Sequence, residues 1–164
     1  MVQAFSYGCP HCYSLEPLIT NWREKQVSDV DFWHFPAVWN KSMALYARAF
    51  YAAQALNITE KIHLPLFTAI VVDQKRLSNQ SELADFFAHY GVDKKAFDKA
   101  FHSFATESQV KQAEARARSY HLASVPEIII NGKYRIDPMR AGGRQQMFAV
   151  VDFLVDKERA LLKK

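Results

Sequence analysis

Apolar residues near the N-terminus predict a strand, a helix and a second strand. The apolar run over residues 2–6 is typical of a short buried strand. The following helix opens at Pro10, because proline fits the first helical turn, and we expect Pro17 to bend it. Residues 30–35 are aromatic and β-branched, which predicts a strand that Pro36 ends. The apolar face of the helix consists of Leu15, Leu18, Ile19 and Trp22.

From residue 40 to residue 120 apolar side chains recur with helical spacing, which predicts a block of successive helices. We expect Pro65 to bend or start the second of them. Asn79 and Glu82 have the spacing of a capping box at the start of the third, which Gly91 ends.

Two more helices complete this block. The fourth has an aromatic face, which consists of Phe97, Phe101 and Phe104. Thr106 and Gln109 predict a second capping box, which opens the fifth helix.

After this block the period changes, and residues 127–136 predict a β-hairpin with its turn at Asn131 and Gly132. A last helix is expected over residues 143–160. The order predicts an α/β protein in which strand–helix–strand and hairpin–helix form one unit. We therefore expect one domain from residues 1–38 and 121–164 and a helical insertion over residues 39–120, with its last helix bridging the two. The inward face of the last helix consists of Phe148, Val151, Leu154 and Val155.

Composition fits one folded domain. Of the 164 residues, 49% are hydrophobic and 23% are charged, and the formal net charge is only +4. The basic residues at the C-terminus are expected to form a solvated helix end, and no basic stripe with interleaved aromatics predicts nucleic-acid binding. No apolar run is long enough to span a bilayer. The basic C-terminal residues mentioned above are Lys157, Arg159, Lys163 and Lys164.

Met1 is followed at once by the apolar strand, without a basic region, an apolar segment or a cleavage site typical of a targeting segment. We therefore expect any targeting segment to be absent from this chain.

The chain has only two cysteines, Cys9 and Cys12, too few for a disulfide scaffold. The histidines outside this pair are scattered singly, so we expect surface or capping roles and no metal site. They are His34, His63, His89, His102 and His121.

The segment Cys9-Pro10-His11-Cys12 follows a strand and opens a helix, as a redox motif requires. The helix N-terminus and the imidazole of His11 would stabilise a thiolate at Cys9, and a stable thiolate makes the disulfide more oxidising. Cys12 would be buried and would open and reclose the disulfide. A structural disulfide and a zinc half-site are the alternatives. The first closes too short a loop to stabilise much, and the second lacks its other ligands.

Pro126 stands just before the predicted hairpin. In thioredoxin folds a cis proline at this place faces the cysteine pair and leaves the preceding backbone free to pair with substrate, so we expect a cis Val125–Pro126 bond. Tyr7, beside the motif, could offer apolar contact to substrate.

The sequence resembles the DsbA family of periplasmic thiol oxidases. The matching stretches are FSYGCPHCYSLEP, SVPEIIINGKYRI and the helical block between them. The resemblance implies a thioredoxin fold with an inserted all-helical domain and no cofactor. It also implies that the protein introduces disulfides into unfolded, cysteine-containing exported proteins in the periplasm. A membrane quinone-linked partner of the DsbB type would reoxidise it, and a monomer is the default expectation.

Two positions depart from the family pattern. Gln3 replaces a buried acidic residue proposed to handle protons for the buried thiol, and Phe32 replaces a lysine. Because glutamine cannot shuttle a proton, we expect exchange at Cys12 to rely on water or on another group.

Three other functions stay open at this point. The chain could be a reductase or isomerase of the same fold, although it has no spare sequence for a dimerisation region. It could be a chaperone with a structural disulfide. It could also be a glutathione-dependent enzyme, which would not need Cys12.

Overall fold

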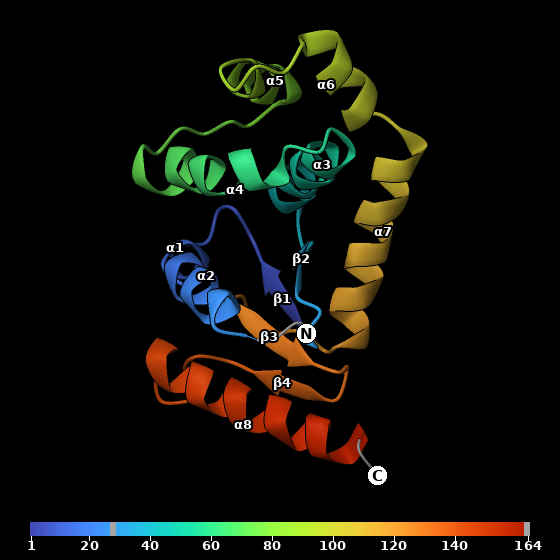
Figure 1. The fold of residues 1–164 in the computed structure, drawn as a ribbon. Helices are drawn as coiled ribbons and strands as arrows, with labels where there is room; N and C mark the ends of the chain where they lie inside the picture. The colour runs from blue at the N-terminus through green and yellow to red at the C-terminus, as the bar shows by residue number, and fades with distance from the viewer. Residues whose placement is uncertain (27–28, 163–164) are drawn as a thin grey trace.

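The computed structural model describes residues 1–26 and 29–162, so the predictions for Lys163 and Lys164 lie outside the described residues. A four-stranded sheet has the order β2-β1-β3-β4, with β1 parallel to β2 and antiparallel to β3. Figure 1 shows this sheet between α8 on one side and the helices α3 to α6 on the other. The strands are β1 (Val2–Phe5), β2 (Trp33–Pro36), β3 (Glu127–Ile130) and β4 (Tyr134–Ile136).

The helices follow the predicted order. Two short helices lie between β1 and β2, five helices lie between β2 and β3, and α8 follows the hairpin. No helix of the described ranges is long and apolar enough to cross a membrane. The helices are α1 (Pro10–Tyr13), α2 (Glu16–Glu24), α3 (Lys41–Ala55), α4 (Thr59–Phe67), α5 (Gln80–Ala88), α6 (Lys94–Phe101), α7 (Phe104–Ser119) and α8 (Arg144–Leu162), with a π-helical turn η1 (Thr68–Val72) after α4.

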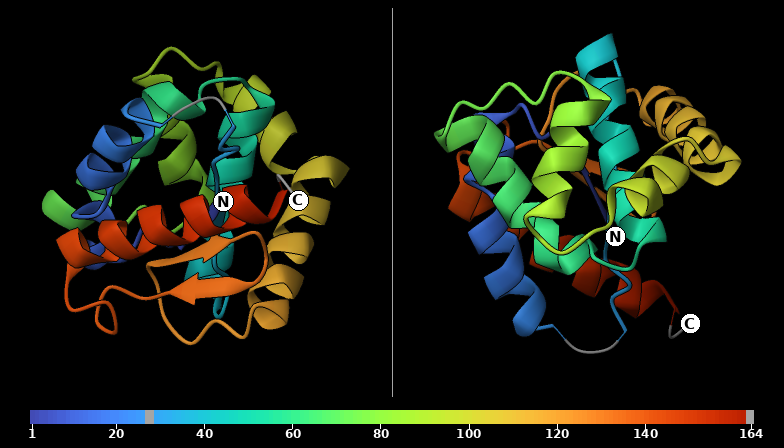
Figure 2. Two further views of the ribbon diagram at one scale, coloured as in Figure 1. Left: turned by 60° about the horizontal axis from the view of Figure 1, so that its bottom comes forward. Right: turned by 90° about the horizontal axis from the view of Figure 1, so that it is seen from above.

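Each face of the sheet has its own hydrophobic core. The α2 and α8 helices cover one face, where Ile19 and Val151 pack with Ile128 of β3. Figure 2 shows α8 lying across the sheet on that side. On the other face, Val2 and Ile129 belong to one core with the helical block. Because that core is continuous, the domain boundaries at residues 38 and 120 stay a prediction.

The predicted helix after β1 is broken. Residues 10–13 form α1, and α2 begins anew at Glu16, with Pro17 in its first turn. Proline is tolerated there because the N–H groups of the first turn have no partner within the helix. The break places Cys12 on α1 and Glu16 on α2, two separate short helices.

The second strand ends at Pro36, as predicted, but it begins only at Trp33 and includes Pro36 as its last paired residue, opposite Phe5. The backbone N–H groups of Trp33 and Ala37 donate to the oxygens of Met1 and Phe5 in the direction of β1. Successive residues of a strand point their N–H groups to opposite sides, so an N–H at residue 36 would point away from β1. No strand of the described residues lies on that side, which is why proline is tolerated at this position of an edge strand.

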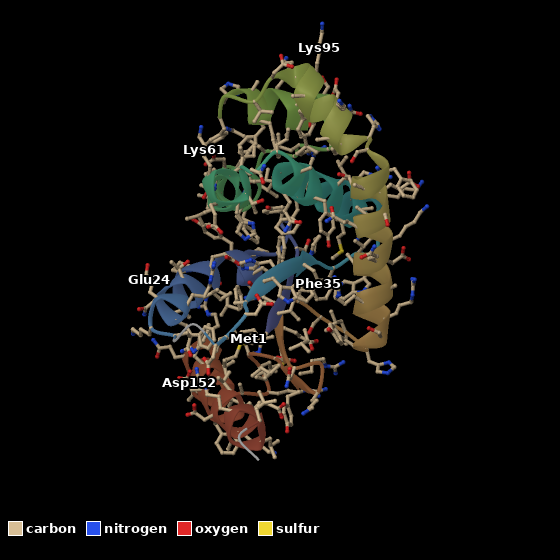
Figure 3. The ribbon with its side chains drawn as sticks, turned by 45° about the vertical axis from the view of Figure 1, so that its right-hand side comes forward. Met1, Glu24, Phe35, Lys61, Lys95 and Asp152 are labelled. Atoms are coloured by element: carbon tan, nitrogen blue, oxygen red, sulfur yellow. The ribbon has the colours of Figure 1, made fainter. Side chains whose placement is uncertain are left out.

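One prediction for the helical block is wrong. Phe104 is not on the apolar face of α6; it is the first residue of α7 and is 87% exposed. The hydroxyl of Ser103 accepts a hydrogen bond from the N–H of Thr106 at 3.1 Å, so α7 begins earlier than the predicted capping box. Figure 3 shows Phe35 inside the molecule beside α7, whereas Lys95 extends from the far end of the block.

Other local predictions are confirmed. Asn79 accepts a hydrogen bond from the N–H of Glu82 at 3.0 Å and caps α5. Asn131 and Gly132 both have positive φ, 52° and 71°, in the turn between β3 and β4. Pro65, by contrast, does not start α4, which begins at Thr59; it lies inside α4 just before the π-helical turn. In α8, Met147 is buried and Phe148 is only partly buried against the core.

Candidate active site

Cys9 is the N-cap residue of α1, with φ −103° and ψ 110°. This extended backbone turns its sulfur over the start of the helix, where the N–H of Cys12 donates to Cys9 Sγ at 3.4 Å. Pro10 follows at the first helical position, and both Pro10 and His11 are exposed. The local sequence therefore holds one sulfur at a helix N-terminus, where a negative charge is stabilised.

The pKa of Cys9 is lowered to about 6. The largest cause is a hydrogen bond from the Cys12 side chain. Backbone N–H groups of Cys12 and His11 and the charge of His11 add to it, and partial burial opposes it. Cys9 is therefore mostly a thiolate at neutral pH.

Cys12 has the opposite character. Its side chain is 0% exposed, and burial, followed by the hydrogen bond to Cys9, raises its pKa far above the ordinary range of a thiol. Both cysteines are free in this structure. The pair therefore combines a half-buried thiolate at Cys9 with a protonated, buried thiol at Cys12.

Val125 and Pro126 lie at this pair although they are far away in sequence. The Cys9 Sγ lies 3.5 Å from the Val125 carbonyl oxygen, to which it donates. The Val125–Pro126 peptide bond is cis, as predicted.

Tyr7 is buried, although the sequence suggested that it contacts substrate. Its side chain is 1% exposed, and its ring packs against Phe5 and Phe67 at centroid distances of 5.1 and 4.7 Å. The hydroxyl shares a hydrogen bond with His63 Nδ1 at 2.8 Å. An aromatic residue so enclosed offers almost no surface to a substrate, so the structure contradicts the expected apolar contact.

An open depression of about 640 Å³ adjoins Cys9 and Val125. Its wall includes Trp39, which is 46% exposed, with Met43 and Tyr46 of α3. Sequence reasoning missed these three residues. A large exposed aromatic residue next to the Asn40 cap of α3 was the available signal.

A second polar cluster lies in the interior behind the motif. Glu16, His34 and His63 come together there, so the expectation of surface or capping roles is wrong for these two histidines. Gln3 is buried and donates from Nε2 to Glu16 Oε1 at 3.2 Å. Three separate elements supply the cluster, which explains why no local spacing revealed it.

The cluster has electrostatic consequences. Burial acts to raise the pKa of Glu16, but the neighbouring His63 and His34 outweigh it and the pKa is lowered. Burial, followed by the charge of His63, lowers the pKa of His34 to about 4. The charge of Glu16 also contributes to the raised pKa of Cys12. A buried acidic group is thus present near the buried thiol even though Gln3 itself cannot ionise.

Comparison with known proteins shows the family of the chain. Residues 23–155 match the family model of the DSBA-like thioredoxin domain. The chain is 38% identical over 164 residues to the thiol:disulfide interchange protein DsbA of Pseudomonas aeruginosa. This similarity covers 100% of this chain and 78% of that protein. It is 40% identical over 163 residues to the protein of the same name from Pseudomonas syringae pv. tomato, covering 99% of this chain and 76% of that one.

Solved structures show the same similarity. The crystal structure of Pseudomonas aeruginosa DsbA matches with a TM-score of 0.94 and 39% identity, over 99% of this chain and 85% of that chain. The oxidoreductase DsbA from Xylella fastidiosa matches with a TM-score of 0.91 and 31% identity, over 97% and 85%. The chain therefore belongs to the DsbA family of thiol:disulfide oxidoreductases, with a thioredoxin-like fold and with Cys9 and Cys12 as its cysteine pair.

Proposed function

We propose that this protein donates the Cys9–Cys12 disulfide to newly exported proteins in the periplasm. The observation that carries the proposal is the contrast between the two sulfurs: the pKa of Cys9 is lowered to about 6, while Cys12 stays protonated and buried. A stabilised thiolate favours the reduced form of the pair, so the disulfide is a strong oxidant.

The reaction consists of two exchanges. A substrate thiolate attacks Cys9 Sγ, the S–S bond breaks, and Cys12 leaves as a thiolate that takes up a proton. A second substrate thiolate then attacks the substrate sulfur of the mixed disulfide and releases Cys9 as a thiolate. The substrate loses two electrons and gains a disulfide, and the Cys9–Cys12 pair gains those electrons.

Cys9 is the sulfur that the substrate reaches, because it is the more exposed of the two. Pro10 and His11 are the exposed residues between the cysteines, and His11 supplies positive charge to the thiolate. We assign substrate backbone pairing to the carbonyl of Val125 and to the turn at Pro126. The depression beside Trp39 and Met43 would hold the apolar side chains of an extended substrate.

The family membership supports cysteine-containing polypeptides as substrates and a DsbB-type partner for reoxidation. We extend this to a membrane quinone-linked partner and to a monomer as the working form. A reductase or isomerase of the same fold is the competing function.

The test is the redox equilibrium of the pair in graded glutathione buffers, together with oxidation of a dithiol peptide. We expect a potential more oxidising than that of glutaredoxins, which lie at about −200 to −230 mV. Cys9→Ser should abolish peptide oxidation, whereas the exposed-site control His89→Ser should retain it. A potential as low as that of thioredoxin, about −270 mV, would reverse the assignment and indicate a reductase.

A further inference from the structure

Three side chains of types that bind metals converge inside the molecule from three different elements. Glu16 comes from α2, His34 from β2 and His63 from α4. Glu16 Oε2 lies 3.4 Å from His63 Nε2 and 3.8 Å from His34 Nε2. One ligand atom from each residue lies within 4.8 Å of the other two. Figure 3 shows α2, which ends at the labelled Glu24, and α4, which carries Lys61, one above the other on the same side of the molecule.

The imidazole nitrogens that face this carboxylate are unsatisfied. His34 Nε2 and His63 Nε2 are both buried and have no hydrogen-bond partner in the part of the chain that the structure describes. Buried polar atoms are nearly always paired, because leaving one unpaired has a substantial energetic cost. Two unpaired nitrogens aimed at one carboxylate oxygen therefore indicate a missing common partner.

The distances fit a metal ion better than direct hydrogen bonds. Hydrogen bonds from nitrogen to oxygen measure about 2.7–3.2 Å, shorter than both separations here. Zinc binds imidazole nitrogen and carboxylate oxygen at about 2.0–2.2 Å with tetrahedral geometry, which places neighbouring ligand atoms about 3.3–3.6 Å apart. Both separations between the carboxylate and the imidazoles, 3.4 and 3.8 Å, are close to that range, and the two imidazoles offer ligand atoms within 4.8 Å of each other.

Neighbouring residues already orient two of the three ligands. The Tyr7 hydroxyl lies 2.8 Å from His63 Nδ1 and can accept a hydrogen bond from it, which leaves Nε2 free to bind. Gln3 donates to Glu16 Oε1 at 3.2 Å and leaves Oε2 facing the two imidazoles. Such outer hydrogen bonds fix the tautomer and rotation of metal ligands. They also assign a role to Gln3, which is the residue that departs from the family pattern.

The cluster is reachable from solvent. A cavity of about 460 Å³ between α2 and α4 is lined by all three residues, with Thr20, Thr59 and Leu64 at its wall. An ion could enter by this route, and a water molecule could occupy a fourth position on it.

We propose that Glu16, His34 and His63 form a binding site for a divalent transition-metal ion of the zinc type. Two imidazoles and one carboxylate suit zinc and exclude calcium and magnesium, which prefer oxygen ligands. None of its three ligands is a thiol, so Cys9 and Cys12 are not part of the site. A purely structural histidine–carboxylate network is the competing explanation.

The experiment uses the oxidised protein, in which the disulfide offers no thiolate to the metal, after treatment with a chelator. Zn²⁺ is titrated by calorimetry, and Co²⁺ is added as a spectroscopic probe. We expect one ion per chain and the intense visible absorption of four- or five-coordinate cobalt. We expect each ligand variant to weaken binding by more than about a hundredfold, which is more than the loss of a residue that only hydrogen-bonds a ligand typically causes. These variants are Glu16→Gln, His34→Gln and His63→Gln. The exposed control His89→Gln should leave the affinity unchanged.

A second variant and a measurement on the unaltered protein guard against misfolding. Tyr7→Phe removes only the outer hydrogen bond and should weaken binding by about 10–100-fold. The Tm of the oxidised wild-type protein should rise with Zn²⁺ concentration, because the folded state alone holds the three ligands together. The proposal is overturned if Zn²⁺ leaves this Tm unchanged and cobalt keeps the weak spectrum of the aqueous ion. It is also overturned if the ligand variants bind as tightly as His89→Gln.

Discussion

The sulfur of Cys9 donates to the backbone carbonyl of Val125 at 3.5 Å, across 116 positions of sequence. This contact exists only while the thiol carries its proton. When Cys9 ionises, the carbonyl loses its donor and is free to accept an N–H from another chain. Ionisation of the Cys9 thiol and release of a backbone acceptor beside it are therefore one event.

The first prediction concerns the pH dependence of Cys9. The rate at which iodoacetamide alkylates the reduced protein should follow the thiolate and reach half its maximum near pH 6, because the pKa of Cys9 is lowered to about 6. Cys12→Ala removes the side-chain hydrogen bond that is the largest cause of this lowering, so its midpoint should move to higher pH. Equal midpoints in the two proteins would show that the Cys12 side chain does not stabilise the thiolate.

The second prediction concerns His11. His11→Ser removes the charge near Cys9 but keeps the backbone N–H, so the pKa of Cys9 should rise. Each unit of rise makes the equilibrium with glutathione about tenfold less oxidising. Thiol trapping in graded glutathione buffers measures this equilibrium, with His89→Ser as the matched control. An unchanged equilibrium constant would remove His11 from the chemistry of the pair.

The local parts of this site could be predicted from sequence. The Cys9–Cys12 motif and the turn at Asn131 each depend on a few adjacent residues, so short patterns were sufficient. The cis bond at Pro126 could be predicted only from the likeness to thioredoxin folds, because nothing in its neighbouring residues requires it. The start of α7 was harder, because Ser103 and Thr106 are both good N-cap residues and only the tertiary packing chooses between them.

The cluster of Glu16, His34 and His63 could not be predicted from spacing. His34 reaches it because β2 pairs in parallel with β1, where it lies opposite Gln3. His63 reaches it because α4 packs back over the same end of the sheet. Sequence patterns describe single elements well, whereas a site built from several elements depends on register and on packing.

The third prediction concerns an ion pair in which only the carboxylate is buried. Glu127 is 2% exposed, and its Oε2 lies 2.8 Å from Nε of the exposed Arg135. Arg135→Ala should lower the free energy of unfolding by about 1–3 kcal/mol at neutral pH, because the buried carboxylate loses its partner and the carbonyls of Tyr120 and His121 lose a donor. The exposed pair of Arg118 and Glu114 is the control, and Arg118→Ala should cost about 0.5 kcal/mol or less.

The pH dependence of this variant gives an independent check. Burial raises the pKa of Glu127 above its ordinary value, so the folded state holds this proton more tightly than the unfolded state. The contribution of Glu127 is therefore most favourable at low pH and is lost as pH rises through its folded pKa. Without Arg135 this loss should grow. Urea denaturation at several pH values measures how much lower the free energy of unfolding is in Arg135→Ala than in the wild type. We expect this difference to shrink as the pH is lowered, and a difference that stays constant with pH would contradict the assignment.

The fourth prediction compares two adjacent glycines before α8. Gly143 has φ 132°, a region that only glycine adopts readily; an added Cβ would meet Gln146 Oε1 at 2.6 Å, but that end of a flexible, exposed side chain can move away, so the backbone decides the cost. Gly142 has φ 83° and open space around it. Gly143→Ala should therefore cost about 1–3 kcal/mol and Gly142→Ala about 1–2 kcal/mol. Thermal or urea unfolding measures both, and a larger effect at Gly142 would contradict this ranking.

Pro36 has a further consequence for the edge of the sheet. Its ring occupies the outer side of β2, where an ordinary residue would present an N–H. Pro36 is itself buried, so at this point the edge of the sheet offers neither an N–H nor an open side to a further strand. Extension of the sheet from β2, a route that leads to aggregation, is therefore disfavoured at this residue.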